Sequence, residues 1–282
     1  MIAAPFAVPD SARAKAGQLD TLLQQLGSVV VAFSGGVDSA YLAVTAARVL
    51  GGQALAVTGD SASYPESHRR LALDVARDFQ LRHEFVATAE LLREGYRQNA
   101  GDRCYHCKTE LYGTLSTLAR ARGFAAVVDG TNADDRGDYR PGRKAAREYG
   151  VRSPLDELGF TKTDIRALAH AYDIPVWDEP ASACLSSRIP HHSEVTADKL
   201  AQIERAEDAV RALGFRVFRV RHHDQLARLE VGVDELDRAQ EPAMTGRLTA
   251  ALQAAGYEAA ELDPRGYRQG SLNAPLFLRP VP

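Results

Sequence analysis

The hexapeptide Ser34-Gly35-Gly36-Val37-Asp38-Ser39 lies between an apolar run at 29–33 and a helical pattern at 40–50. A strand, a glycine turn and a helix form the context in which backbone N–H groups bind phosphate oxygens. Because glycine has no Cβ, the backbone can approach an anion closely, and the two serine hydroxyls can add hydrogen bonds. Asp38 suits an anion site only if Mg²⁺ lies between its carboxylate and the phosphates. The stretch therefore predicts a phosphate-binding loop that uses magnesium.

This loop is not a Walker A motif, because the required lysine and glycine spacing are absent, and it is not G-x-G-x-x-G either. The alternative is a plain glycine turn that joins a buried strand to a helix. The hexapeptide resembles the pyrophosphate loop of the ATP pyrophosphatase superfamily. That resemblance implies cleavage of ATP to AMP and pyrophosphate, with adenylation of a substrate oxygen.

The pattern along the chain predicts an α/β fold of the doubly wound, parallel-sheet type, with a smaller α+β domain after it. Ligands of such sheets bind at the carboxyl ends of the strands, where the glycine loop lies. We place the domains at 1–189 and 190–282, with the boundary near Ile189. Thr161 and Asp164 resemble a capping box at a helix start. The expected strands are 29–33, 54–57, 83–87, 124–128, 215–221, 226–231 and 257–262, the later ones paired mostly without long crossovers, and the expected helices are 11–27, 39–50, 65–79, 107–122, 196–213 and 234–255.

The composition limits the class of protein. The chain has 282 residues and a net charge of -3, so it has no overall attraction for nucleic acid or an acidic membrane. No apolar run approaches the roughly 20 residues that span a bilayer, and residues 1–15 lack the pattern of a signal peptide. We therefore expect a cytoplasmic protein that binds neither membranes nor nucleic acid.

The cysteines Cys104, Cys107 and Cys184 are too few for a closed disulfide framework. The C-x-x-C pair at 104–107 is compatible with zinc, a redox pair, iron–sulfur ligation or simple burial. Three thiolates leave one position open, which suits a cluster that binds an external sulfur atom. Cys184 lies near Arg188, and an adjacent cation favours the reactive thiolate; the alternative is a buried bystander.

Arg219 and Arg221 are two residues apart on an expected strand, so they share a face. Two guanidinium groups on one face can clamp a phosphate. The alternative is a solvated edge strand whose charges oppose aggregation. Glu230, on the next strand, is a candidate partner for one of these arginines.

Several segments together resemble the LarE-type ATP-dependent sulfur transferases. They are SGGVDS at 34–39, GDRCYHCKTELY at 101–112, DGTNADD at 129–135, ASACLSSRIP at 181–190 and RVRHHDQLARLEV at 219–231. The resemblance implies adenylation of the carboxylates of pyridinium-3,5-biscarboxylic acid mononucleotide with ATP and Mg²⁺, followed by conversion to thiocarboxylates for the nickel-pincer nucleotide cofactor of lactate racemase. It also implies a homo-oligomer, with a hexamer as the family's known form.

The family divides by sulfur source, and the cysteine pattern bears on that division. One branch uses a lone cysteine that surrenders its sulfur and becomes dehydroalanine; the other holds a [4Fe–4S] cluster on three cysteines. This sequence matches the second pattern, with Cys184 as a sacrificial donor the alternative. The sequence does not identify the sulfur donor, which is sulfide or a desulfurase. Other possible functions are tRNA thiolation, amidation, or a non-catalytic nucleotide- or metal-binding module.

Each predicted role has candidate residues in the sequence. The catalytic candidates are Cys184 and Asp38, and the cluster ligands are Cys104, Cys107 and Cys184. The nucleotide-binding candidates are Ser34, Gly35, Gly36, Val37, Asp38, Ser39, Asp60, Ser61, Gly130 and Thr131, and the substrate-binding candidates are Arg188, Arg219, Arg221 and Glu230.

Overall fold

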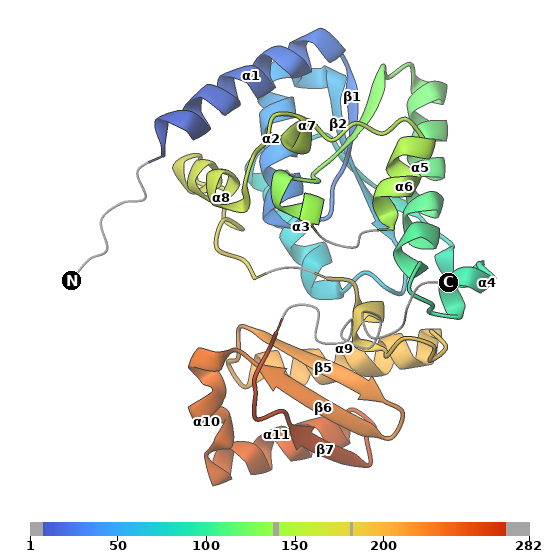
Figure 1. Cartoon of the computed structure of the whole chain (residues 1–282), viewed down its shortest axis with the longest axis vertical. Helices are drawn as coiled ribbons and strands as arrows, with labels where there is room; N and C mark the ends of the chain where they lie inside the picture. Colours follow the sequence, from blue (N-terminus) through green and yellow to red (C-terminus); the bar gives the residue numbers. More distant parts are fainter. Residues whose placement is uncertain (1–7, 138–140, 181–182, 269–282) are drawn as a thin grey trace. The chain divides into compact units, whose positions relative to one another are not determined.

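A computed structural model describes residues 8–137, 141–180 and 183–268 (Figure 1). The chain forms two compact units. The first comprises Met1–Glu90 and Cys104–Ser182, and the second comprises Leu91–Arg103 and Ala183–Pro282. Each unit has its own hydrophobic core.

The first unit contains a parallel sheet with the strand order β3-β2-β1-β4. Its strands are β1 (Val29–Ala32), β2 (Ala54–Asp60), β3 (His83–Ala87) and β4 (Ala126–Asp129). The apolar run of β1 is buried at every position, as expected for a central parallel strand with both faces covered. The predicted α/β class and parallel sheet are confirmed.

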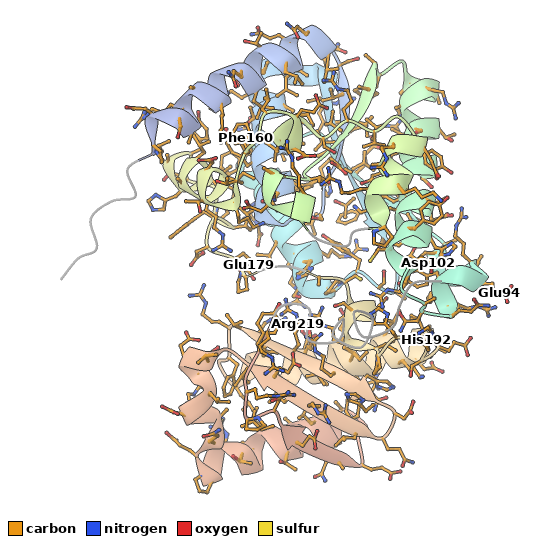
Figure 2. The ribbon with its side chains drawn as sticks, in the orientation of Figure 1. Glu94, Asp102, Phe160, Glu179, His192 and Arg219 are labelled. Carbon is orange, nitrogen blue, oxygen red and sulfur yellow. The ribbon has the colours of Figure 1, made fainter. Side chains whose placement is uncertain are left out.

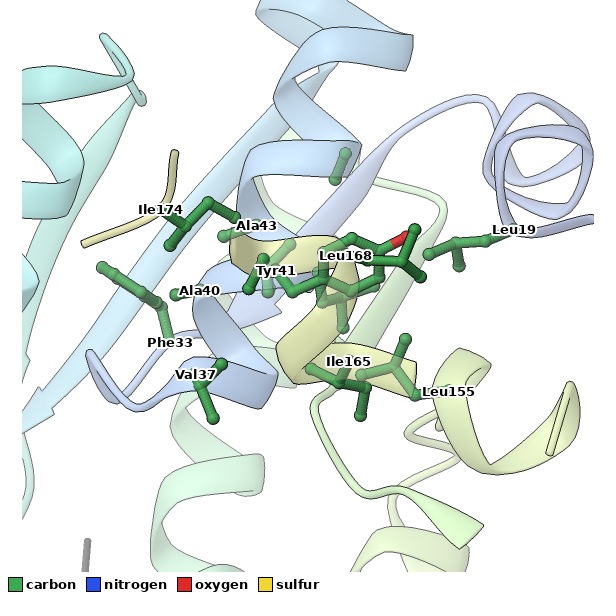
Figure 3. Packing of buried hydrophobic residues seen from close by; sticks show 14 of the residues in the cluster. Leu19, Phe33, Val37, Ala40, Tyr41, Ala43, Leu155, Ile165, Leu168 and Ile174 are labelled. Atoms are coloured by element: carbon green, nitrogen blue, oxygen red, sulfur yellow. The ribbon is translucent and has the colours of Figure 1, made fainter. Parts of the chain in front are cut away.

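Helices cover both faces of this sheet (Figure 1). Alternate residues of β1 enter different cores: Val29 and Val31 pack with α1, α2 and α8, whereas Val30 packs with α5 and α6. Figure 3 shows the first of these cores around Tyr41. The helices of this unit are α1 (Asp10–Leu26), α2 (Val37–Leu50), α3 (Glu66–Asp78), α5 (Arg103–Arg122), α6 (Gly142–Glu148), α7 (Pro154–Glu157) and α8 (Lys162–Ala171), with short 3-10 turns η1 (Gly51–Gln53) and η3 (Ala133–Gly137). A further turn, η2 (Glu90–Leu92), begins in this unit and ends in the second.

The second unit is an α+β fold with the strand order β5-β6-β7. Strands β5 (Phe218–His223) and β6 (Leu226–Val231) form an antiparallel hairpin. Strand β7 (Ala259–Leu262) pairs with β6 in parallel, so the expectation of no long crossover is wrong there. Parallel neighbours need a crossover connection. The intervening helices are α10 (Leu236–Gln240) and α11 (Pro242–Ala254), preceded by η5 (Val233–Glu235), and the unit also holds α4 (Glu94–Arg97), η4 (Leu185–Arg188) and α9 (Ala197–Ala212).

The division between the units differs from the sequence-based boundary near Ile189. It falls at Ser182/Ala183, and residues 91–103 join the second unit. The physical reason is a set of hydrogen bonds from Asn99, whose side-chain amide donates to the carbonyls of Pro190 at 2.7 Å and Ser193 at 3.1 Å. Its own carbonyl accepts the N–H of His192 at 2.9 Å.

Two further expectations concern the helices. The capping box at Thr161 is confirmed, since the Thr161 and Asp164 side chains each accept the other's backbone N–H. Within the described ranges, every helix is too short or too polar to span a bilayer. Ala181 and Ser182, which belong to the family segment at 181–190, lie outside the described residues.

Candidate functional site

The glycine loop connects β1 to α2 at the carboxyl edge of the parallel sheet (Figure 1). Gly35 has a φ of +73°, a conformation that side-chain-bearing residues rarely adopt. A Cβ there would lie 2.9 Å from the backbone nitrogen of Ala72 and 3.1 Å from the carbonyl oxygen of His68. Gly36 is extended and precedes the first helical residue, Val37. The loop therefore needs glycine at 35 and ends at the N-terminus of a helix.

The two serines of the loop have different surroundings. The Ser39 hydroxyl is buried, accepts the N–H of Ser34 at 3.1 Å and donates to the carbonyl of Gly36 at 3.0 Å. Ser34 is exposed, and its hydroxyl lies 3.1 Å from that of Ser39. Ser39 thus holds the loop in shape, whereas Ser34 is exposed to solvent.

Asp38 forms an ion pair that the sequence analysis missed. Its Oδ2 lies 2.5 Å from the ammonium nitrogen of Lys162, at the start of α8. Its Oδ1 is buried and has no hydrogen-bond partner among the described residues. Burial raises the pKa of Asp38, and Lys162 opposes that shift. An unpartnered carboxylate oxygen beside a phosphate-type loop fits a Mg²⁺ ligand.

The loop after β4 meets the glycine loop directly. A Cβ on Gly130 would lie 2.8 Å from the backbone nitrogen of Ser39, so only glycine permits this approach. The Thr131 hydroxyl donates to Asp129 at 3.0 Å. Ser153 donates to the same carboxylate at 2.7 Å. The structure therefore brings Gly130 against the glycine loop and engages Thr131 within its own turn.

Asp60 is the last residue of β2, and Ser61 follows it at the same edge of the sheet. Asp60 forms an ion pair with Arg69. The Ser61 hydroxyl donates to the carboxylate of Glu90 at 2.5 Å, and Glu90 is only 2% exposed. Both residues thus lie where a nucleotide site is expected, with internal partners already in place.

The three cysteines are free thiols. Cys104 is exposed and Cys107 is half-buried, and both occupy the first turns of α5 in the first unit. Residues three apart on a helix share a face. Cys184 is half-buried in the second unit, immediately before η4. Among the described residues, no group of three or more His, Cys, Asp or Glu side chains is arranged to hold a metal ion.

Arg188 is 3% exposed and is engaged within the second unit. Its Nε and Nη2 each lie 2.8 Å from a carboxylate oxygen of Glu207 on α9. Its Nη1 donates to the carbonyls of Ala183 at 2.8 Å and Cys184 at 3.1 Å. Arg188 therefore fastens the loop that carries Cys184 to α9.

Arg219 and Arg221 are buried on β5, at 8% and 5% exposure, so the solvated-edge alternative is wrong. Figure 2 labels Arg219 in the second unit. Arg221 donates to Glu230 at 2.9 and 2.7 Å, which confirms the expected partner. The Arg219 guanidinium lies 4.9 Å from the ring centre of Tyr267. Burial, together with nearby Arg188, lowers the pKa of Arg219. Clustered, buried guanidinium groups favour binding of an anion.

Sequence reasoning missed two further residues that shape this unit. Glu207 lies on the same helical stripe as the buried Ile203 and Val210, and a carboxylate in an apolar stripe is a signal for a buried ion pair. Arg103, which precedes Cys104, donates to the carbonyl of Ser186 at 2.7 Å. No local sequence pattern indicates this contact between Arg103 and Ser186.

Comparison with known sequences gives matches along most of the chain. The asparagine synthase family matches residues 18–135. An uncharacterised Synechocystis protein is 40% identical over 262 residues, which cover 92% of this chain and 98% of that protein. A probable tRNA sulfurtransferase of Methanobrevibacter smithii is 26% identical over 201 residues, 66% of this chain and 50% of the relative.

A further relative has a named activity. Pyridinium-3,5-bisthiocarboxylic acid mononucleotide synthase of Lactiplantibacillus plantarum is 36% identical over 263 residues, 93% of this chain and 95% of the synthase. The match covers nearly the full length of both proteins, so it spans the glycine loop and both structural units. The chain therefore belongs to the family of this synthase, the LarE family of PP-loop sulfur transferases.

Proposed function

We propose that this protein uses ATP to convert the carboxylates of pyridinium-3,5-biscarboxylic acid mononucleotide to thiocarboxylates, in nickel-pincer cofactor biosynthesis. The observation that carries the proposal is Asp38, whose unpartnered Oδ1 lies in a glycine loop at a helix N-terminus. The L. plantarum relative, named for the bisthiocarboxylic acid product, supports the choice of substrate.

The first step is adenylation. A carboxylate oxygen of the substrate attacks the α-phosphorus of ATP, and the bond from that phosphorus to the bridging β-phosphate oxygen breaks. The loop N–H groups at the start of α2 bind the departing pyrophosphate. Asp38 would hold Mg²⁺, which supplies positive charge to the phosphates when it is bound.

The second step replaces oxygen with sulfur. A sulfur nucleophile attacks the acyl carbon of the adenylate, and AMP leaves with the carbon–oxygen bond electrons. Arg219 and Arg221 bind the phosphate of the pyridinium nucleotide, with Glu230 orienting Arg221. Arg188 positions the loop of Cys184 through Glu207.

The sulfur source is the finer part of the proposal. The three free thiols suit a [4Fe–4S] cluster, because three cysteine ligands leave one iron open to an external sulfur. Cys104, Cys107 and Cys184 would hold this cluster, which would supply a bound sulfur atom. The alternative source is the Cys184 sulfur itself. We further expect a cytoplasmic homo-oligomer that receives sulfur from sulfide or a desulfurase.

The test is a reconstitution under anaerobic conditions with ATP, Mg²⁺, sulfide and the biscarboxylic nucleotide. We expect AMP and pyrophosphate in equal amounts, and mass spectrometry should show oxygen replaced by sulfur in the substrate. The control omits the pyridinium nucleotide and should release little pyrophosphate. Pyrophosphate release that does not depend on this nucleotide would contradict the substrate assignment. A tRNA substrate that is thiolated instead would favour the tRNA alternative.

A further inference from the structure

A cavity of about 480 Å³ lies in the first unit, at the end of α2 that is opposite the glycine loop. Its wall includes Gly52, two residues before β2, and Arg82, the residue before β3. Both positions are at the amino edge of the parallel sheet, whereas the glycine loop follows β1 at the carboxyl edge. The volume is in the range of small-molecule sites, so this edge of the sheet offers a candidate site of its own.

Two aromatic side chains border the cavity, and each follows the last residue of a helix. Phe79 follows α3, and Tyr172 follows α8. Tyr172 is 39% exposed, although its ring also stacks on that of Tyr41, with 6.2 Å between the ring centres. Aromatic rings pack favourably in stacked or edge-to-face arrangements. The wall therefore favours a ligand that has a flat aromatic ring.

The charged side chains that line the cavity are positive. Arg48 and Arg82 line it, and among the described residues no aspartate or glutamate does. Arg48 is 49% exposed and pairs with Asp20 on α1 at 2.5 Å, whereas Arg82 donates to the carbonyl of Gly52. A guanidinium group has five N–H donors, so each arginine keeps donors for a ligand beside these contacts. Two such groups from different elements favour a phosphate.

The wall also contains polar groups that can form further hydrogen bonds. Thr45 is 1% exposed and borders the cavity, and its hydroxyl has no hydrogen-bond partner among the described residues. Helix α2 ends at Leu50, next to Gly51 in the cavity wall, and the last carbonyl groups of a helix have no partners within it. A hydroxyl and carbonyl groups complement a ring that carries both donors and acceptors, as a nucleobase does.

We propose that this cavity is a second nucleotide site, which binds a nucleoside monophosphate. The base packs against Phe79 and Tyr172, and its N–H groups face the carbonyl groups at the end of α2. The phosphate binds Arg48 and Arg82 through charge-assisted hydrogen bonds. A triphosphate fits less well, because no described carboxylate lines the cavity to hold the Mg²⁺ that accompanies it. AMP, which the proposed adenylation releases, is one such ligand, but its binding here does not depend on that reaction.

Equilibrium dialysis with radiolabelled AMP measures this site in the presence of a saturating non-hydrolysable ATP analogue, which occupies the glycine-loop site. We expect about one AMP to remain bound per chain. Gly52→Trp should abolish this binding by filling the cavity, since a Cβ at Gly52 meets no atom within 4 Å and the residue has no positive φ. Arg82→Met should weaken AMP binding about tenfold, because it removes one guanidinium group.

Arg77→Met is the matched control. Arg77 is a 69% exposed arginine on α3 that pairs with Asp74 and Asp78 and does not line the cavity. This variant should keep the wild-type AMP affinity. Thermal denaturation of each variant shows whether it is folded, and Arg82→Met still tests the site if Gly52→Trp does not fold.

Adenosine separates the contribution of the phosphate from that of the base. It should bind at least about tenfold more weakly than AMP, because it lacks the phosphate. Equal affinity for adenosine and AMP would overturn the inference, as would complete displacement of AMP by the ATP analogue or unchanged AMP affinity in both cavity variants. AMP bound here without turnover of the pyridinium nucleotide would support the second site and contradict the proposed function alone.

Discussion

Arg188 and Glu207 form a two-point ion pair in the interior of the second unit, with both nitrogen–oxygen distances 2.8 Å. Their side chains are 3% and 6% exposed. Burial alone would raise the pKa of Glu207, but the facing Arg188 outweighs it and keeps that pKa below its usual value. Glu207 also accepts the backbone N–H of Val220 on β5 at 3.1 Å. One carboxylate thus connects the Cys184 loop, α9 and β5.

We predict that Glu207→Gln destabilises the protein by about 3–5 kcal/mol, because it leaves a buried guanidinium without its counter-charge. Urea denaturation measures this free energy of unfolding. The control is Asp208→Asn, which removes the exposed pair with Arg211 and should cost about 0.2–1 kcal/mol. Equal losses in the two variants would show that the buried pair contributes no more than a surface pair.

Gly130 gives a second prediction, because its Cα faces the backbone of the glycine loop. In Gly130→Ala, the new Cβ would lie 2.8 Å from the nitrogen of Ser39. We expect the loop to shift and the affinity for magnesium ATP to fall about tenfold, which is about 1.4 kcal/mol and lies within the roughly 1–3 kcal/mol that overpacking costs. Calorimetric titration with a non-hydrolysable ATP analogue measures this nucleotide affinity.

The matched control for that prediction is Gly17→Ala. Gly17 is exposed on α1, and no atom lies within 4 Å of its added Cβ. This variant should keep nucleotide affinity and gain about 0.5–1 kcal/mol of stability, since alanine replaces glycine inside a helix. Normal affinity in Gly130→Ala would show that the two loops separate easily and do not form one site.

Features with a local cause could be predicted from the sequence. Strand β1 is a continuous apolar run, the glycine loop has an uncommon composition, and Thr161 and Asp164 have capping-box spacing. The pairing of Arg221 with Glu230 follows from two neighbouring strands of a hairpin. In each case, the residues that determine the structure lie within a few positions or on adjacent strands.

Features that depend on distant contacts could not be predicted. The Lys162–Asp38 pair and the grouping of residues 91–103 with the second unit both join segments far apart in the chain. The parallel pairing of β7 depends on how α11 packs back on the sheet. Sequence alone also showed that Arg219 and Arg221 share a face, without showing that the face is buried.

A third prediction concerns acid. Arg265 donates hydrogen bonds to Asp263 and lowers the pKa of this carboxyl to about 2, although burial opposes the shift. Because the folded-state pKa lies below the usual 3.8, Asp263 adds stability that is complete above that pH and is lost as pH falls toward 2. We expect Asp263→Asn to flatten the decline of stability in this window.

Chemical denaturation at several pH values below about 5 measures that decline. Glu261→Gln is a suitable control, because Glu261 is 46% exposed and pairs with Arg228 on the neighbouring strand. The control should keep the wild-type pH dependence. An Asp263→Asn variant with an unchanged profile would assign the acid sensitivity to other carboxylates, such as Glu207, whose pKa is also lowered.

The cysteines give the fourth prediction. After anaerobic purification and reconstitution, a three-thiolate site should hold about four iron and four sulfide ions per chain. Cys104→Ala, Cys107→Ala and Cys184→Ala should each lose this iron, because each removes one of the three ligands. Iron and acid-labile sulfide assays measure both ions, and an electron paramagnetic resonance spectrum of the reduced protein identifies the cluster type.

His106→Ala is the matched control, since His106 lies between the two cysteines of α5 and is not one of the proposed ligands. The His106→Ala variant should retain its iron. Loss of iron from this variant would show that the histidine is a ligand and would contradict a site made of three thiolates alone. If wild-type protein binds no specific iron, mass spectrometry after turnover decides the remaining question. Loss of sulfur from Cys184, with dehydroalanine in its place, would then make this cysteine a single-use donor, because the thiocarboxylate would contain the sulfur atom that the cysteine has lost.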